Sequence, residues 1–172
     1  FAHFYFLSAD LPRAARLFDT YEGVHLDLAP GVELLYNLSR DTAAARAFFT
    51  RYADRILFGT DVDSSLTARE ADLRCDLVKR WLETDEAYRV PAGADMLLGP
   101  PEDGGIAGLA LPEAVRARIC RGNFARRPGA RPAPVKRDAL VAECERIAAA
   151  AEVLAGPAGA APARAARQAL IG

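Results

Sequence analysis

Two aspartates, Asp61 and Asp63, follow an apolar run, residues 56–58, and a Gly-Thr step. A carboxylate at the end of an apolar run has three ordinary fates. It is solvated, it caps the following turn, or it coordinates a cation. Asp61 is therefore the first candidate for chemistry in this chain, and its role depends on the elements that position it.

The apolar run before Asp61 has helical patterns on both sides, which indicates a buried strand of a parallel sheet. Gly59 would let the backbone pass close to a neighbouring segment where this strand ends. Residues 24–28 alternate between apolar and polar side chains and predict a second strand. Residues 1–4 predict the end of a third strand, with His3 near its carboxyl end. Because α/β folds bind ligands at the carboxyl ends of strands, Asp61 is expected at such a site.

Helices are expected between and after these strands. Thr67 and Glu70 match a capping box, and Leu73, Leu77 and Trp81 follow at spacings of four on one apolar face. Strands separated by helices imply a parallel sheet with right-handed crossovers, which places the chain in the α/β class. The further expectations are helices over 12–21, 40–52 and 111–121, and a long loop over 84–108.

The chain is expected to contain two parts, residues 1–128 and residues 129–172. The second part begins within a basic, proline-rich connector over 126–134. Its pattern predicts a helix over 137–154, a break at Gly156-Pro157, and a final Ala/Arg-rich helix. The second part is thus a helical extension of the first.

The composition limits the partners. A formal net charge of −1 gives no reason to expect a nucleic acid or an anionic membrane. No apolar run has the length of a membrane span. The three cysteines are far apart and odd in number, which favours reduced thiols and a cytoplasmic location over a disulfide framework. The chain opens at Phe1, inside an expected strand, so we expect it to be part of a longer protein.

Several segments together resemble the amidohydrolase-related family, which comprises metal-dependent hydrolases and decarboxylases built on a (β/α)₈ barrel. The resemblance implies that residues 1–128 are the C-terminal part of such a TIM barrel, with its sixth to eighth strands. His3 would close the sixth strand and Asp61 the eighth. The segments that carry the resemblance are His3 and the helix after it, residues 24–30, residues 52–61 and residues 111–124.

The family resemblance also implies a chemistry. Asp61 and His3 would be metal ligands and catalytic residues, with Zn²⁺ as the expected cation and Mn²⁺ as the alternative. Asp61 would accept the proton of the attacking water, and His3 would bind a second metal or polarise the substrate carbonyl. The substrate would be a small organic molecule cleaved at a C–N, C–O or carboxyl C–C bond. The family's His-x-His pair is missing, so the chain is expected to be inactive alone.

Two other functions compete with the hydrolase. Residues 61–66 resemble the nucleophile motif of haloacid-dehalogenase-like phosphatases, in which Asp61 would attack phosphorus and Asp63 would act as acid and base beside Mg²⁺. Alternatively, the chain is a non-catalytic truncated barrel that acts as an interaction module, with Leu140, Ile147 and Leu154 available for packing. The sequence leaves open whether the protein is a homo-oligomer.

Overall fold

The computed structural model describes residues 1–30, 33–91, 104–127 and 134–172. The chain divides into two compact units, Phe1–Ala130 and Arg131–Gly172. The predicted boundary after residue 128 lies close to this division. Among the described residues, no helix combines the length and the apolarity needed to cross a membrane.

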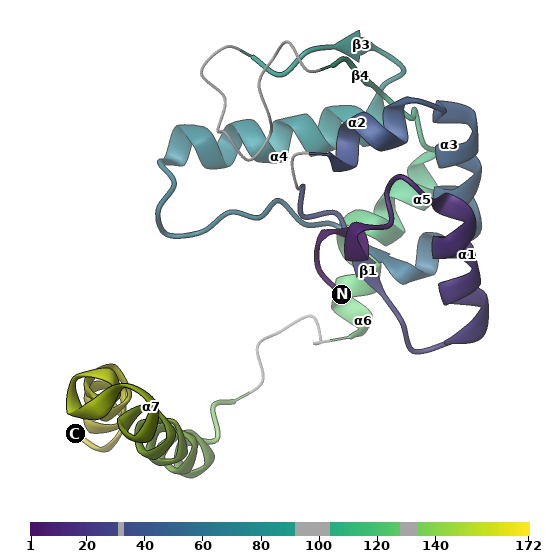
Figure 1. The fold of residues 1–172 in the computed structure, drawn as a ribbon. Helices are drawn as coiled ribbons and strands as arrows, with labels where there is room; N and C mark the ends of the chain where they lie inside the picture. Colours follow the sequence, from purple (N-terminus) through teal and green to yellow (C-terminus); the bar gives the residue numbers. More distant parts are fainter. Residues whose placement is uncertain (31–32, 92–103, 128–133) are drawn as a thin grey trace. The chain divides into compact units, whose positions relative to one another are not determined.

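The first unit is mostly helical (Figure 1). Its 3₁₀ turns are η1 (His3–Phe6) and η2 (Ala53–Arg55), and a π-helical turn spans Arg118–Gly122. Its α-helices are α1 (Leu11–Thr20), α2 (Leu34–Ser39), α3 (Thr42–Arg51), α4 (Ala68–Glu83), α5 (Glu113–Ala117) and α6 (Asn123–Arg126). Its strands are β1 (Leu26–Asp27), β2 (Ile56–Leu57), β3 (Ala87–Tyr88) and β4 (Ile106–Ala107).

The prediction of a partial TIM barrel is wrong. Within the described residues the parallel strands are β1 and β2 alone, paired with Leu26 opposite Ile56 and Asp27 opposite Leu57. Strands β3 and β4 form a separate antiparallel pair inside the segment expected to be a loop. Apolar runs long enough for barrel strands therefore pair over only two residues each, and helices cover the remaining apolar surface.

The first residues do not continue as a strand either. Phe1 pairs with the start of β1, since its amino group lies 2.7 Å from the carbonyl oxygen of His25 and its own carbonyl accepts from Asp27 N at 3.1 Å. The chain then turns into η1, where His3 to Phe6 all have φ between 51° and 54°. This left-handed conformation is uncommon for residues other than glycine and ends the pairing at once.

Three helices of the first unit, α1, α3 and α4, begin at side-chain caps. Asp10 accepts a hydrogen bond from Arg13 N at the start of α1, and Thr67 and Glu70 form the capping box of α4. Helix α3 begins after Asp41, which accepts from Ala44 N. The capping box was visible in the sequence and is confirmed.

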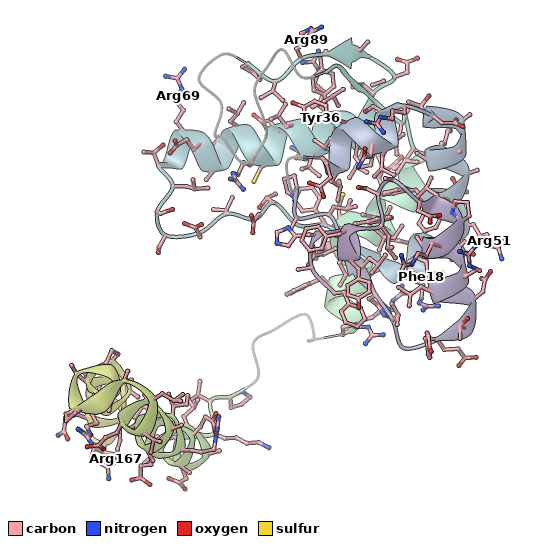
Figure 2. All side chains as sticks on the ribbon, in the orientation of Figure 1. Phe18, Tyr36, Arg51, Arg69, Arg89 and Arg167 are labelled. Atoms are coloured by element: carbon pink, nitrogen blue, oxygen red, sulfur yellow. The ribbon has the colours of Figure 1, made fainter. Side chains whose placement is uncertain are left out.

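An aromatic cluster fills the core between α1, α3, α4 and η1. Phe49 is fully buried, with ring centroids 5.9 Å from Phe4 and 5.3 Å from Trp81. Phe18 of α1 packs on Phe48 at 5.8 Å, and Figure 2 shows it inside the unit while Arg51 projects from the surface. Each such side chain contributes roughly 1.5–3 kcal/mol by leaving water. This core positions the ends of β1 and β2.

The second unit is one long helical element, α7 (Arg137–Ile171), broken at Gly156. Gly156 has φ +69°, so the chain reverses there and two helical arms lie against each other (Figure 1). Arg167, labelled in Figure 2, donates from Nε to Glu145 at 2.7 Å across the arms. The predicted break at Gly156-Pro157 is confirmed.

Candidate functional site

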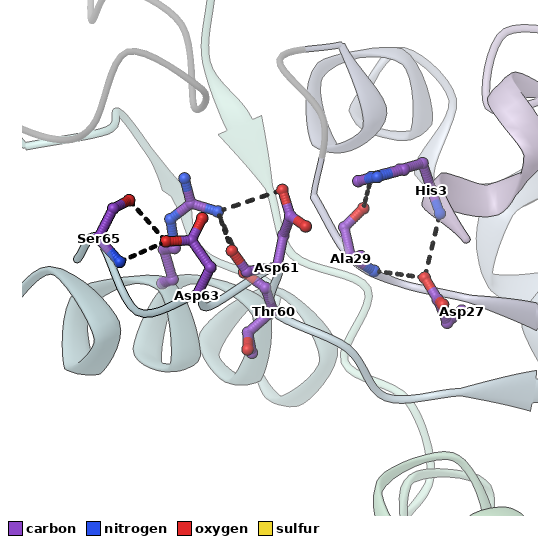
Figure 3. Close-up of polar contacts among 8 residues, drawn as sticks. His3, Asp27, Ala29, Thr60, Asp61, Asp63 and Ser65 are labelled. Atoms are coloured by element: carbon purple, nitrogen blue, oxygen red, sulfur yellow. Dashed lines mark hydrogen bonds and ion pairs between the residues drawn. The ribbon is translucent and has the colours of Figure 1, made fainter. Parts of the chain in front are cut away.

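Asp61 lies four residues beyond the end of β2, in a strained and well-held segment. Its φ is +55°, in the left-handed region that residues other than glycine adopt at a cost of order 1 kcal/mol or more. The Nη1 atom of Arg74, on α4, donates to the carbonyl oxygens of Asp61 at 2.9 Å and Thr60 at 3.3 Å (Figure 3). Helix α4 thus fixes the backbone around Asp61 through Arg74.

The Asp61 carboxylate itself stays accessible. Its Oδ2 lies 3.6 Å from Arg74 Nη1, and its side chain is 37% exposed while that of Arg74 is fully buried. A buried guanidinium therefore holds the backbone and faces a carboxylate that is open to a ligand on its other side. This is the strongest feature of the candidate site.

Sequence reasoning missed Arg74, although a signal was present. Arg74 lies three, four and seven residues before Leu77, Val78 and Trp81, all of which are buried. This spacing places it on the apolar face of α4. An arginine on such a face is exceptional and needs a partner, and here it reaches the loop after β2.

Asp63 has a local structural role. Its Oδ1 accepts hydrogen bonds from the backbone N of Ser65 at 2.6 Å and from the Ser65 hydroxyl (Figure 3). These bonds form an Asx turn and lower the pKa of Asp63. The Asp63 carboxylate is thus engaged in the turn that it forms with Ser65.

His3 belongs to a second network, at the end of β1. Its backbone N donates to Asp27 Oδ1 at 3.1 Å, and the same oxygen accepts from Ala29 N at 3.0 Å. The ring Nδ1 of His3 lies 3.2 Å from the carbonyl oxygen of Ala29. Because that oxygen only accepts, Nδ1 carries the proton, and Nε2 is the ring nitrogen with a lone pair. Asp27 is thus an anchor for the backbone around His3.

Gly59 brings the ends of the two strands together. A Cβ atom on Gly59 would lie 2.9 Å from Ala29 N and 3.5 Å from Asp27 Oδ1. The predicted close approach at Gly59 is confirmed. Figure 3 shows the result as two neighbouring networks, one around His3 and Asp27 and one around Asp61 and Asp63.

The prediction that Asp61 and His3 bind a metal ion requires further ligands. In the parts of the chain that the structure describes, no group of three His, Cys, Asp or Glu side chains is placed to hold a metal ion. A catalytic zinc site takes three protein ligands and one open position. The described residues therefore do not fit Zn²⁺ or Mn²⁺ by themselves.

Comparisons with known proteins add no relative. The chain matched no family model, no curated protein and no solved structure. The resemblance to amidohydrolases stays a prediction that rests on the residues quoted for it.

Proposed function

We propose that this chain supplies Asp61, and with it His3, to a metal-dependent hydrolase that cleaves a C–N, C–O or carboxyl C–C bond of a small organic substrate. The proposal concerns the chemistry of these side chains and does not depend on a barrel fold.

The proposal is supported by the hydrogen bonds with which Arg74 holds the backbone at Asp61. The two hydrogen bonds from Arg74 to the carbonyl oxygens of Thr60 and Asp61 fix the backbone that carries the Asp61 carboxylate. The exposed side of this carboxylate is free to accept the proton of an attacking water. A general base needs this combination of a fixed position and access to solvent. Asp63, whose carboxylate is used by Ser65, lacks it.

His3 fits a supporting role. Its protonated Nδ1 is held by the Ala29 carbonyl, an arrangement that commonly orients a histidine whose Nε2 binds a metal or a substrate oxygen. The free cysteines favour the cytoplasm as the location of this activity.

The test compares Asp61→Asn with Asp63→Asn in the protein expressed from its natural gene. Metal content is measured by mass spectrometry after purification with added Zn²⁺ or Mn²⁺, and hydrolysis on a panel of N-acyl amino acids and aryl esters. Asp61→Asn should lower bound metal and hydrolysis at least tenfold, whereas Asp63→Asn should keep both within about twofold. Equal losses in the two variants, or a natural protein without metal, would refute the proposal.

A second candidate function, an interaction module, has one observation in its favour. Helix α7 exposes Leu140, Ile147 and Leu154 at 41%, 44% and 86%. We therefore also propose self-association through α7. Light scattering should show that Leu154→Glu converts a dimer to a monomer, and a monomeric parent protein would rule this candidate out.

A further inference from the structure

A cavity lies at the opposite end of the β1–β2 pair from Asp61. Its volume is about 590 Å³, and it is lined by His25, Asp54, Asn123, Arg126 and Arg127. His25 directly precedes β1, Asp54 belongs to η2, and the other three residues come from α6 and the residue after it. The proposed hydrolase uses none of these side chains.

Positive charge exceeds negative charge around this cavity. The single lining carboxylate, Asp54, accepts from Arg126 at 3.0 Å and from Arg118 at 3.4 Å. Arg55, close behind His25, donates to backbone carbonyls, among them that of Val24 at 2.7 Å. Two guanidinium groups therefore contact the one lining carboxylate, and those of Arg55 and Arg127 add positive charge beside His25, in a chain whose formal net charge is −1.

Arg127 has an unusual neighbour among the described residues. Its Nη2 lies 2.7 Å from Nδ1 and 2.9 Å from Nε2 of His25, and Nδ1 is also 3.2 Å from the Gly23 carbonyl oxygen. Since that carbonyl only accepts, Nδ1 carries the proton, and the Arg127 guanidinium lies against both ring nitrogens. Two cationic or potentially cationic side chains that line the cavity are thus in direct contact.

The electrostatic surroundings of His25 agree with this geometry. Burial is the largest cause that lowers the pKa of His25, and the hydrogen bond to the Gly23 carbonyl opposes it. The positive charges of Arg127 and Arg55 lower the pKa further. An anion in the cavity would remove this penalty and turn the imidazole into a second donor.

We propose that the cavity binds a small phosphate group, with Arg126, Arg127 and His25 as its donors. Arg126 is already oriented, because it bonds to Asp54 and to the Oδ1 of the buried Asn123. A guanidinium presents parallel N–H donors that match phosphate oxygens, and preorganised donors lose little entropy on binding.

The test is calorimetric titration of the purified chain with inorganic phosphate, methyl phosphate and acetate. Saturable binding of a phosphate that Arg127→Gln weakens at least tenfold, and that acetate does not reproduce, would support the proposal. Tighter binding of methyl phosphate would indicate a phosphomonoester ligand, and tighter binding of inorganic phosphate would indicate the free ion.

Two controls make the test decisive. Arg146→Gln removes an equally exposed arginine from α7 and should leave binding unchanged, as should Asp61→Asn, so failure here is independent of the hydrolase. The His25 pKa, followed by NMR, should rise on phosphate addition. Absent binding, equal binding of acetate, or equal losses in Arg127→Gln and Arg146→Gln would overturn the proposal.

Discussion

The side-chain Nδ2 of Asn123 lies 2.6 Å from the carbonyl oxygen of Ile56, the first residue of β2. The same nitrogen donates to the Ala53 carbonyl at 2.6 Å, and Asn123 is only 1% exposed. One buried amide therefore satisfies two backbone acceptors on either side of η2. The segment around Asn123 closes the first unit by fixing the entry into β2.

Asn123→Ala should destabilise the first unit. It leaves two inward-facing carbonyl groups without their donor, which costs about 1–3 kcal/mol for a buried group. Urea denaturation measures the change in the free energy of unfolding. Arg121→Ala, an exposed change two residues earlier, should cost less than about 0.5 kcal/mol. Similar effects of the two substitutions would mean that the Asn123 amide is not a structural tie.

Gly59→Ala should be far more harmful than Gly23→Ala. The new methyl group would lie 2.9 Å from the backbone N of Ala29, and only a shift of β1 or β2 makes room for it. At Gly23 it meets nothing within 4 Å. We expect a loss of about 1–3 kcal/mol for the first change and almost none for the second, measured by thermal unfolding. A stable Gly59→Ala protein would show that the strand ends are farther apart.

Phe49→Ala should cost about 3–5 kcal/mol, because it empties the centre of the aromatic cluster between Phe4 and Trp81. Phe124→Ala provides the matched control, since Phe124 is 61% exposed. The control should change the free energy of unfolding by no more than about 0.5 kcal/mol. A reversal of this order would place the core elsewhere.

Arg74→Gln should loosen the segment after β2. The carbonyl groups of Thr60 and Asp61 lose their donor, so amide hydrogen exchange in residues 60–63 should speed up at least tenfold. Lys79→Gln, on the exposed side of α4, should leave exchange there unchanged. Equal exchange in both variants would mean that Arg74 does not hold Asp61.

The pKa of His25 is lowered in the folded protein, so the folded state binds fewer protons than the unfolded chain just below the ordinary value of 6.5. Above that value His25 is neutral in both states and does not change the free energy of unfolding. As the pH falls through 6.5 towards the folded pKa, the free energy of unfolding declines. Denaturation at pH values of about 7.5 and 5.5 should show a smaller decline for His25→Gln than for the parent protein. An identical decline in both would contradict the lowered pKa.

The features that the sequence predicted correctly depend on neighbouring residues. The Thr67–Glu70 capping box and the break at Gly156 each involve side chains or backbone angles within one helical turn. Gly59 was recognised because glycine after an apolar run commonly marks a close backbone approach. Such local signals do not require knowledge of the rest of the chain.

The features that the sequence did not predict depend on distant partners. No local pattern predicts the left-handed turn at His3, which is held by Asp27 and by the burial of Phe4 against Phe48 and Phe49. The apolar runs were long enough for barrel strands. The edge of β2 that faces away from β1 bonds to the C-terminal turns instead, since Phe58 N donates to Ile119 and Ile56 accepts from Asn123. A strand's length depends on its neighbours in space.

The hydrogen bond from Phe58 to Ile119 also bears on how the protein is made. Strand β2 leaves the ribosome well before Ile119 and Asn123. The carbonyl of Ile56 and the N–H of Phe58 therefore lack these partners until the later residues have been synthesised. Closing such long loops is slow compared with forming the early helices. A nascent chain that stops short of α6 therefore displays a β2 strand whose outer-edge backbone groups still lack their partners.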